Sequence, residues 1–326
     1  MITLQTPAIR VDVDDEYGAT IVRVADSLGR NSLAHYDWET PIPARRGISY
    51  GNDDLDLHSG FRGGWQETFP NAGLPSVVDG VPLPFHGEAT TARWSVDEVS
   101  ETRCVLHVPS RLPLELTRTM ELDPHRAVLR IEGEVRNVGA VPADFVWGQH
   151  PAFPATAGAR LDFPAGARIR PDVERSGGLR LEPTAWPMAE RESGESVDLS
   201  VVREGAHHEL FYLDGLAEGW AAVRQPDGTP SVGLAWDNRV HPYSWLWIQR
   251  FDPGFPFYGR AAMLAIEAQT SWPYDGLGGA RRRNMAHRLG PGETMRSWYT
   301  VSLFENTGAP VVGVARNGDI SLGGAR

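Results

Sequence analysis

The run Leu112-Pro113-Leu114-Glu115-Leu116-Thr117-Arg118-Thr119-Met120-Glu121-Leu122 alternates apolar and polar side chains. Apart from Arg118, its even positions are apolar, and its odd positions are mostly polar. The run Ala127–Val135 alternates in the same way, with apolar or small side chains at its odd positions. A period of two is typical of half-buried antiparallel strands. Because Asp123-Pro124-His125 between them favours a turn, we predict a β-hairpin.

Short strand-like runs recur along the rest of the chain, and no alternation of strands with helices suggests a parallel sheet. The segment Arg260–Gln269 has a high helix propensity, but its neighbours are strand-like, so we predict a strand there as well. The sequence therefore predicts an all-β protein with few helices. Besides the hairpin, the predicted strands are Ile21–Val24, Arg103–Val108, Phe145–Trp147, Glu209–Leu213, Ser231–Trp236, Ser244–Phe251 and Ser297–Phe304.

The composition fits one large domain of many short elements. The chain of 326 residues contains 35 glycines and 25 prolines, which excludes a long-helix or coiled-coil protein. Its 41% of hydrophobic residues is enough for a substantial core. No linker or internal repeat divides the chain, so we predict a single domain over residues 1–326. The glycine-rich tail after Glu305 is expected to be partly disordered.

The charge balance and the missing residue types exclude several functions. The net charge is −11, and the one basic cluster is Arg281-Arg282-Arg283, so no nucleic-acid partner is expected. The sequence contains no lysine, which excludes a Schiff-base lysine and a P-loop. Cys104 is the single cysteine and cannot form an intrachain disulfide. Since Met1–Gln5 does not resemble a signal peptide and no apolar run is long enough to span a membrane, we expect a cytoplasmic protein.

Catalytic and metal motifs narrow the chemistry further. We find no H-E-x-x-H, paired C-x-x-C, EF-hand or G-x-S-x-G pattern, so neither a metal nor a nucleophile elbow is predicted. Three loop-like segments instead mix aromatic with polar residues: Gly60–Gly73, Trp147–Pro154 and Asp252–Gly259. Apolar walls with a few polar groups suit a sugar, because a pyranose ring has an apolar face and a rim of hydroxyls.

The order of these segments resembles the galactose mutarotase-like superfamily, which includes the aldose 1-epimerases. The resemblance extends from about Gly60 to Trp272 and implies a β-supersandwich of large antiparallel sheets, with a site on a concave face. The motifs that carry it are Phe69-Pro70-Asn71-Ala72-Gly73, His86-Gly87, Gln149-His150-Pro151-Ala152-Phe153, Pro253-Gly254-Phe255-Pro256-Phe257-Tyr258-Gly259 and Glu267.

The resemblance also implies roles for single residues. His150 is expected to be the general acid and Glu267 the general base of a cofactor-independent isomerase that interconverts sugar anomers. The partner is a small carbohydrate, and the expected state is a monomer or homodimer. The residues expected to bind the substrate are Arg62, Asn71, His86, Trp147, Gln149, His208 and Trp247.

The chemistry of anomer interconversion suits a histidine and a carboxylate. Ring opening removes a proton from the anomeric hydroxyl and delivers one to the ring oxygen, so one base and one acid suffice. Histidine titrates near neutral pH. Glu267 lies between Ile266 and Ala268 in an apolar run, and burial there is expected to raise its pKa.

Departures from the family pattern keep other functions open. Ala72 stands where an arginine often follows the asparagine, Pro256 replaces a glutamine, and His207 replaces the aspartate of a D-H-x-F segment. Arg62 or Arg93 could supply the missing cation, and because either could hold a phosphate bidentately, a phosphorylated sugar is also possible. A glycoside hydrolase or lyase is the first alternative, with Glu67 as the second carboxylate. The second alternative is a sugar-binding protein without turnover.

Overall fold

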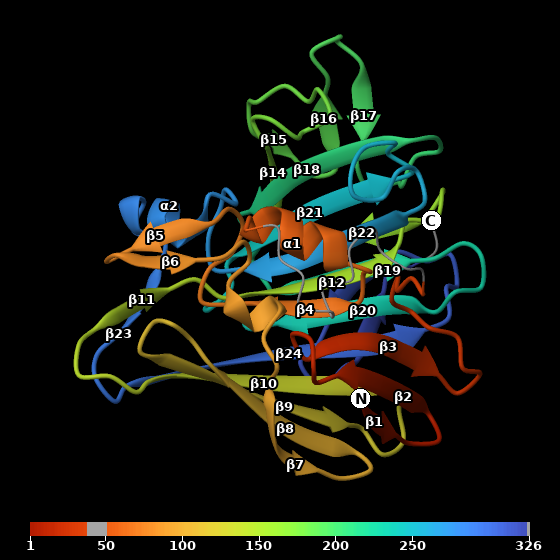
Figure 1. Cartoon of the computed structure of the whole chain (residues 1–326). Helices are drawn as coiled ribbons and strands as arrows, with labels where there is room; N and C mark the ends of the chain where they lie inside the picture. The colour runs from red at the N-terminus through yellow and green to blue at the C-terminus, as the bar shows by residue number, and fades with distance from the viewer. Residues whose placement is uncertain (38–50, 325–326) are drawn as a thin grey trace.

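The computed structural model describes residues 1–37 and 51–324. These residues form two large antiparallel sheets that pack face to face (Figure 1). The larger sheet has ten strands, and its middle is built from segments far apart in the sequence. In order across the sheet, the strands are β1 (Ile2–Gln5), β2 (Ile9–Asp14), β3 (Thr20–Asp26), β4 (Trp65–Thr68), β12 (Gly148–Pro154), β22 (Ala262–Gln269), β21 (Tyr243–Arg250), β18 (His207–Asp214), β14 (Arg168–Pro171) and β15 (Thr184–Ala185).

The second sheet has eight strands and contains the predicted hairpin. Its β9 and β10 pair from Leu122 with Leu129 to Leu114 with Asn137, so the hairpin prediction is confirmed. In order across the sheet, the strands are β13 (Arg160–Asp162), β19 (Trp220–Arg224), β20 (Ser231–Trp236), β24 (Thr294–Phe304), β10 (Val128–Asn137), β9 (Leu114–Leu122), β8 (Arg103–Pro109) and β7 (Ser95–Val99).

Short helices and two-stranded sheets lie around the two large sheets. The helices of the described residues are α1 (Asp53–Gly60), α2 (Gly276–Arg282) and the short 3₁₀ helix η2 (Glu88–Thr90). The two-stranded pairs are β5 (Ser76–Val78) with β6 (Val81–Leu83), β11 (Ala143–Phe145) with β23 (His287–Leu289), β16 (Met188–Glu190) with β17 (Ser196–Asp198), and β25 (Val311–Val314) with β26 (Ile320–Leu322).

The alternation in β9 has the predicted effect on burial. Leu116 and Met120 are fully buried in a core that draws on both sheets. Arg118, the exception in the apolar pattern, is on the same face and is also fully buried. Its Nη1 lies 3.5 Å from Oε2 of Glu67 in β4, so an ion pair bridges the two sheets. Arg118 thus follows the alternation of its strand and is buried although it is charged.

Two strand predictions had different outcomes. The segment around Arg260–Gln269 is β22, so tertiary pairing prevails over its helix propensity. The predicted strand Phe145–Trp147 is wrong, because β11 ends at Phe145 and β12 begins only at Gly148. Between them, Val146 donates its N–H to the carbonyl of Pro70, and that of Trp147 binds Oγ1 of Thr270. Loop partners therefore take the hydrogen bonds that a strand would have used.

The tail after Glu305 is not disordered in its described part. Strands β25 and β26 pair with each other and pack on the eight-stranded sheet. Val311 and Val314 are buried against Trp220, which gives the tail a small apolar core of its own. The high glycine content is compatible with order here because Gly318 lies in the turn between the two strands, while Gly313 lies within the paired strand β25.

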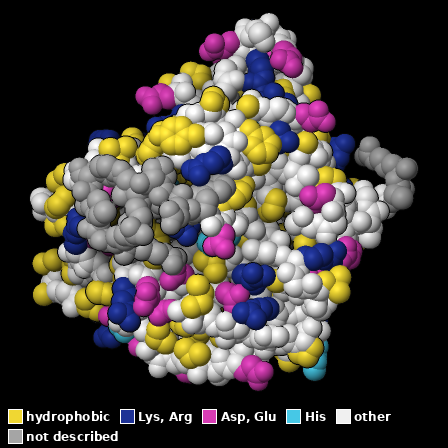
Figure 2. Space-filling model, turned by 45° about the vertical axis from the view of Figure 1, so that its right-hand side comes forward, with side chains coloured by type: hydrophobic (Ala, Val, Ile, Leu, Met, Phe, Trp, Pro, Cys, Tyr) yellow, Lys and Arg dark blue, Asp and Glu magenta, His cyan; other side chains and the backbone are white. Residues whose placement is uncertain are grey.

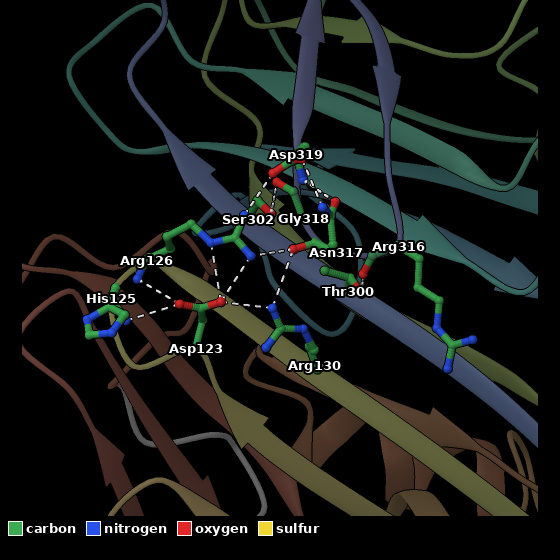
Figure 3. Close-up of polar contacts among 10 residues, drawn as sticks. All are labelled: Asp123, His125, Arg126, Arg130, Thr300, Ser302, Arg316, Asn317, Gly318 and Asp319. Atoms are coloured by element: carbon green, nitrogen blue, oxygen red, sulfur yellow. Dashed lines mark hydrogen bonds and ion pairs between the residues drawn. The ribbon is translucent and has the colours of Figure 1, made fainter.

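Polar contacts fix the same tail to the hairpin turn (Figure 3). Asp123 accepts the N–H groups of His125 at 3.0 Å and Arg126 at 3.1 Å, which closes the turn between β9 and β10. Arg126 then reaches the tail, where it donates to the carbonyl of Asn317 and to Asp319, both at 2.8 Å. The turn thereby provides a charged anchor for the end of the described chain.

The surface carries charges of both signs. On the face seen in Figure 2, acidic and basic side chains are interspersed over the described residues. No helix among these residues has the length and apolarity that crossing a membrane requires.

Candidate functional site

A pocket of about 300 Å³ lies on the face of the ten-stranded sheet that points away from the second sheet. Its floor comes from the neighbouring strands β4, β12, β22, β21 and β18. Helix α1, which lies in front of these strands in Figure 1, forms one wall through Leu55, Leu57 and His58. Another wall is the loop after β21, with Phe255, Pro256 and Phe257. The pocket therefore combines a rigid floor with walls made of loops and one helix.

The strand register brings His150 and Glu267 together. Strands β12 and β22 pair Gly148 with Gln269 and Ala152 with Ala265, which puts His150 opposite Glu267. Nε2 of His150 lies 3.4 Å from Oε1 of Glu267. Both side chains line the pocket. Two residues more than a hundred positions apart thus face the same small volume as a cross-strand pair.

The Glu267 carboxyl is held in a nearly dry environment. Its residue is 2% exposed, and burial raises the pKa to about 8. The amide of Gln269 donates to Oε2 at 3.1 Å and opposes this shift, because it favours the charged form. Oε1 is left to face His150. Burial therefore favours the protonated, uncharged form of Glu267 near neutral pH.

Gln269 has its own support. Its Oε1 accepts a hydrogen bond from Oγ1 of Thr68 at 3.3 Å. Gly148 leaves the room that the amide needs, since a Cβ there would lie 1.8 Å from Oε1 of Gln269. Thr68, Gln269 and Glu267 form a chain of contacts that orients the carboxyl from below.

His150 is neutral for the same physical reason. The residue is 7% exposed, and burial lowers the pKa to about 4. Nδ1 is buried without a hydrogen-bond partner among the described residues. The ring makes edge contacts with Phe61, at 5.5 Å between centroids, and with His86, at 5.3 Å. These aromatic neighbours hold the imidazole in place and leave little of it exposed.

Three more of the predicted residues line this pocket: His86, His208 and Trp247. Nδ1 of His86 accepts the N–H of Gly73 at 3.0 Å, and burial lowers the pKa of His86 well below its usual value. Nε2 of His208 accepts from the Trp247 indole at 2.9 Å, and burial lowers the pKa of His208 too. These histidines are therefore neutral hydrogen-bonding groups beside an apolar indole wall.

Gln149 and Trp147 do not line the pocket. The register of β12 with β4 pairs Gln149 with Glu67, on the face toward the second sheet, and there Oε1 of Gln149 accepts from the Trp65 indole at 2.6 Å. Trp147 is fully buried and donates to Oε1 of Glu67 at 2.6 Å. Successive residues of a strand point to opposite faces. Gln149 therefore cannot join its neighbour His150 in the pocket.

Asn71 and Arg62 are also outside the pocket lining. Asn71 is fully buried, and its amide joins three segments, donating to the carbonyls of Leu74 and Pro84 at 2.9 Å and accepting the N–H of Leu277 at 2.7 Å. Its role in this structure is to hold loops together. Arg62 is half-buried next to Phe61 and does not reach the pocket.

Several lining residues were not predicted from the sequence. They are His58, Gln66, Arg175, Tyr274, Gln249 and Asp252. Asp252 begins the Asp252–Gly259 segment and Gln66 lies inside the Gly60–Gly73 segment, so both had a local signal. His58 and Arg175 had none, since they come from a helix and a loop outside every motif.

The three positions that depart from the family pattern lie in different parts of the structure. Pro256 lines the pocket, whereas Ala72 is 2% exposed in the core and His207 is half-buried. In the part of the chain that the structure describes, no three or more His, Cys, Asp or Glu side chains form a group that could hold a metal ion.

Known structures resemble this fold over nearly the whole chain. A protein from Synechocystis sp. PCC 6803 superposes with a TM-score of 0.67 at 17% identity, covering 92% of this chain and 94% of that one. A proposed aldose 1-epimerase from Escherichia coli K12 gives 0.66 at 17% identity, covering 93% and 98%. A galactose mutarotase-like protein from Lactobacillus casei gives 0.62 at 17% identity, covering 93% and 100%.

No protein-family model matches the chain, and no curated protein sequence matches it either. The likeness is thus one of structure, carried by the order and pairing of the strands rather than by sequence identity. Since these similar structures cover more than nine-tenths of the chain, the protein has the galactose mutarotase-like β-sandwich fold.

Proposed function

We propose that this protein is a carbohydrate mutarotase of the aldose 1-epimerase type, which interconverts the anomers of a small sugar. The observation that carries the proposal is the His150–Glu267 pair, at 3.4 Å, in a pocket of about 300 Å³. The fold shared with mutarotase-like proteins supports it. The indole of Trp247 offers an apolar wall for a pyranose face, and His86 and His208 offer groups for its hydroxyls.

The proposed reaction requires that the His150–Glu267 pair hold one transferable proton, and no proton is gained or lost overall. In ring opening, the anomeric hydroxyl loses its proton, the C1–O5 bond breaks, a C1 carbonyl forms and O5 gains a proton. After rotation about C1–C2, O5 attacks the other face of C1, loses its proton, and the carbonyl oxygen gains one. Each group of the pair returns to its starting state, and nothing is oxidised or reduced.

The pKa values indicate which group holds that proton in the free protein. With values of about 8 for Glu267 and about 4 for His150, the proton resides on the carboxyl near neutral pH. The resemblance implies the opposite starting state, with Glu267 as the base and His150 as the acid. Both states contain the same single proton, and ring closure is the reverse of opening. We therefore propose that the pair acts as a unit in both directions.

The test is anomer interconversion followed by NMR on a panel of aldoses. Wild type is expected to accelerate it, while Glu267→Gln and His150→Gln each lower the rate by about 10²–10⁴-fold, the usual contribution of a proton-transfer group. Gln225→Leu is the control, because that buried glutamine bonds the carbonyl of Pro154 away from the pocket. Unchanged rates in both site variants would reject the assignment.

The two alternatives predict other outcomes of the same test. A hydrolase would need a second carboxylate across the substrate, but Glu67 is on the far face of the sheet beside Arg118. Release of reducing sugar from a polysaccharide would nevertheless favour a glycoside hydrolase. Sugar binding without interconversion by wild type would favour a non-catalytic binding protein. The cytoplasmic location and the monomeric or homodimeric state stay predictions.

A further inference from the structure

Arg175 lies in a loop that is tightly fixed to the edge of the pocket. Oδ1 of Asp172 accepts the N–H groups of Glu174 at 3.0 Å and of Arg175 at 2.9 Å. Oδ2 of Asp172 accepts the hydroxyl of Tyr212 at 2.6 Å, and the carbonyl of Arg175 accepts the N–H of Leu210 at 2.8 Å. The loop is therefore held to β18, one of the strands of the pocket floor.

The guanidinium of Arg175 is positioned but not neutralised. Its central carbon lies 4.7 Å from the centroid of the Tyr274 ring, and both residues line the pocket. Among the described residues, no carboxylate lies within 4.0 Å of the guanidinium and no acceptor receives a hydrogen bond from it, and Nη1 is enclosed without a partner. Asp172 makes no ion pair or hydrogen bond with the guanidinium; its oxygens instead accept the N–H groups of Glu174 and Arg175 and the hydroxyl of Tyr212.

Other arginines of the same region form ion pairs with carboxylates, unlike Arg175. Arg168 and Arg170 both pair with Asp214, and Arg191 and Arg203 both pair with Glu209. Unmet donors of a partly buried guanidinium are costly, so a cation in a pocket wall needs an acceptor from elsewhere. Since the described residues provide no such acceptor, a ligand in the pocket is the partner that this position suits.

The charge states of the other titratable groups that line the pocket are compatible with an anionic ligand. Glu267 carries a proton near neutral pH, and burial keeps His86, His150 and His208 neutral. The carboxylate that still opposes a ligand anion is Asp252, whose side chain is 34% exposed and has Oδ2 3.9 Å from Nδ1 of His208. Asp252 and Arg175 are both half-buried, and the Arg175 cation counters the effect of this carboxylate on a ligand anion.

We propose that Arg175 binds an anionic oxygen group, a carboxylate or a phosphate, at the end of the sugar remote from C1. The loop of Arg175 is held to β18, which is two strands from β22, the strand of Glu267, or on the order of 10 Å across the sheet, so this wall suits the end of the sugar that points away from Glu267. Arginine is suited to the task because its planar fork matches both groups bidentately. The placement of C1 near Glu267 rests on the proposed function; the charge preference does not. Arg62 and Arg93, considered from the sequence for this role, do not line the pocket.

The experiment measures binding and interconversion separately. Calorimetry with glucose, glucuronate and glucose 6-phosphate is expected to show wild type binding one of the charged sugars at least about 10-fold more tightly than glucose, the effect of a charge-assisted contact. Arg175→Met loses that preference and Arg175→Lys loses part of it. Arg316→Met, which removes an exposed arginine with the same stacking on Trp298 at 4.9 Å, keeps it.

The outcomes separate this inference from the proposed function. Equal affinity of wild type for charged and neutral sugars, or an equal loss for all three in folded Arg175→Met, overturns the inference. Charge-dependent binding through Arg175 without anomer interconversion would support the inference and reject the mutarotase. Preference for glucuronate over glucose 6-phosphate identifies a carboxylate as the ligand group, and the reverse preference identifies a phosphate. Thermal unfolding of each variant checks that it is folded.

Discussion

The two faces of the ten-stranded sheet each hold a buried glutamate, and the two differ in their partners. Glu67 points to the second sheet, where it meets the Arg118 guanidinium and the Trp147 indole. Glu267 points to the pocket, where it meets the Gln269 amide and the neutral His150. Burial raises the pKa of both carboxyls, but Arg118 opposes the shift at Glu67. A charged partner makes one carboxylate structural, while its absence leaves the other able to exchange a proton.

The largest expected effect comes from removing the charge of the structural glutamate. Glu67→Gln leaves Arg118 as an uncompensated buried charge, which is expected to lower the free energy of unfolding by about 3–5 kcal/mol. Urea denaturation measures it. The double variant Glu67→Gln, Arg118→Met removes both charges and is expected to recover much of the loss. A single variant as stable as wild type would contradict the view that the pair bridges the sheets.

The pocket glutamate is expected to make stability depend on pH. Its folded pKa of about 8 lies above the usual 4.5, so the folded state binds more protons between these values. Wild type therefore loses stability relative to Glu267→Gln as pH rises from about 5 to 8, by at most about 1.4 kcal/mol per pH unit, and the difference levels off above pH 8. Urea titrations at four pH values check this. Glu195→Gln, at a side chain 68% exposed, is the control without such a trend.

The same two pKa values predict the pH dependence of activity. The pair carries one proton between about pH 4 and about pH 8, so kcat/KM for anomer interconversion is expected to fall on either side of this window. On the acid side His150 becomes protonated, and on the alkaline side Glu267 loses its proton. A profile that continues to rise above pH 9 would contradict the pairing of these groups.

The smallest expected effect comes from changing Gln269, the uncharged residue that donates a hydrogen bond to Glu267. Gln269→Leu removes the N–H that favours the charged form of Glu267, so the alkaline limb of the profile is expected to shift upward by about one pH unit. Thr68→Val leaves the amide in place but removes its support at 3.3 Å, and a smaller shift in the same direction is expected. A fall in rate with no shift of the limb would indicate a structural role for Gln269.

The sequence predicted much of the fold because hydrophobic alternation is local. The hairpin at Leu112–Val135 and the strand in Arg260–Gln269 follow from a period of two and from neighbouring strands. The Phe145–Trp147 strand failed because Thr270 and Pro70, distant in sequence, take its backbone hydrogen bonds. Order in the tail also escaped local reasoning, since its burial depends on Trp220 in another strand.

Only some residues of the candidate site could be predicted from the sequence. The resemblance pointed to five residues that do line one pocket: His86, His150, His208, Trp247 and Glu267. The segment Trp147–Pro154, interpreted from the sequence as loop-like, contains strand β12, and in a strand Gln149 and His150 cannot share a face. Arg175 had no local signal at all, because its place in the pocket depends on how the loop after β14 is fixed to β18.

The amino-acid order alone determined which segments alternate, and hence that antiparallel sheets form and that Arg118 faces the core. Only the tertiary structure decided which face of each strand borders the pocket, and which buried carboxylate has an arginine beside it. The physical reason is the range of the interactions. Alternation and turns act between near neighbours in the chain, whereas desolvation and ion pairing depend on every group that packing brings within a few ångströms.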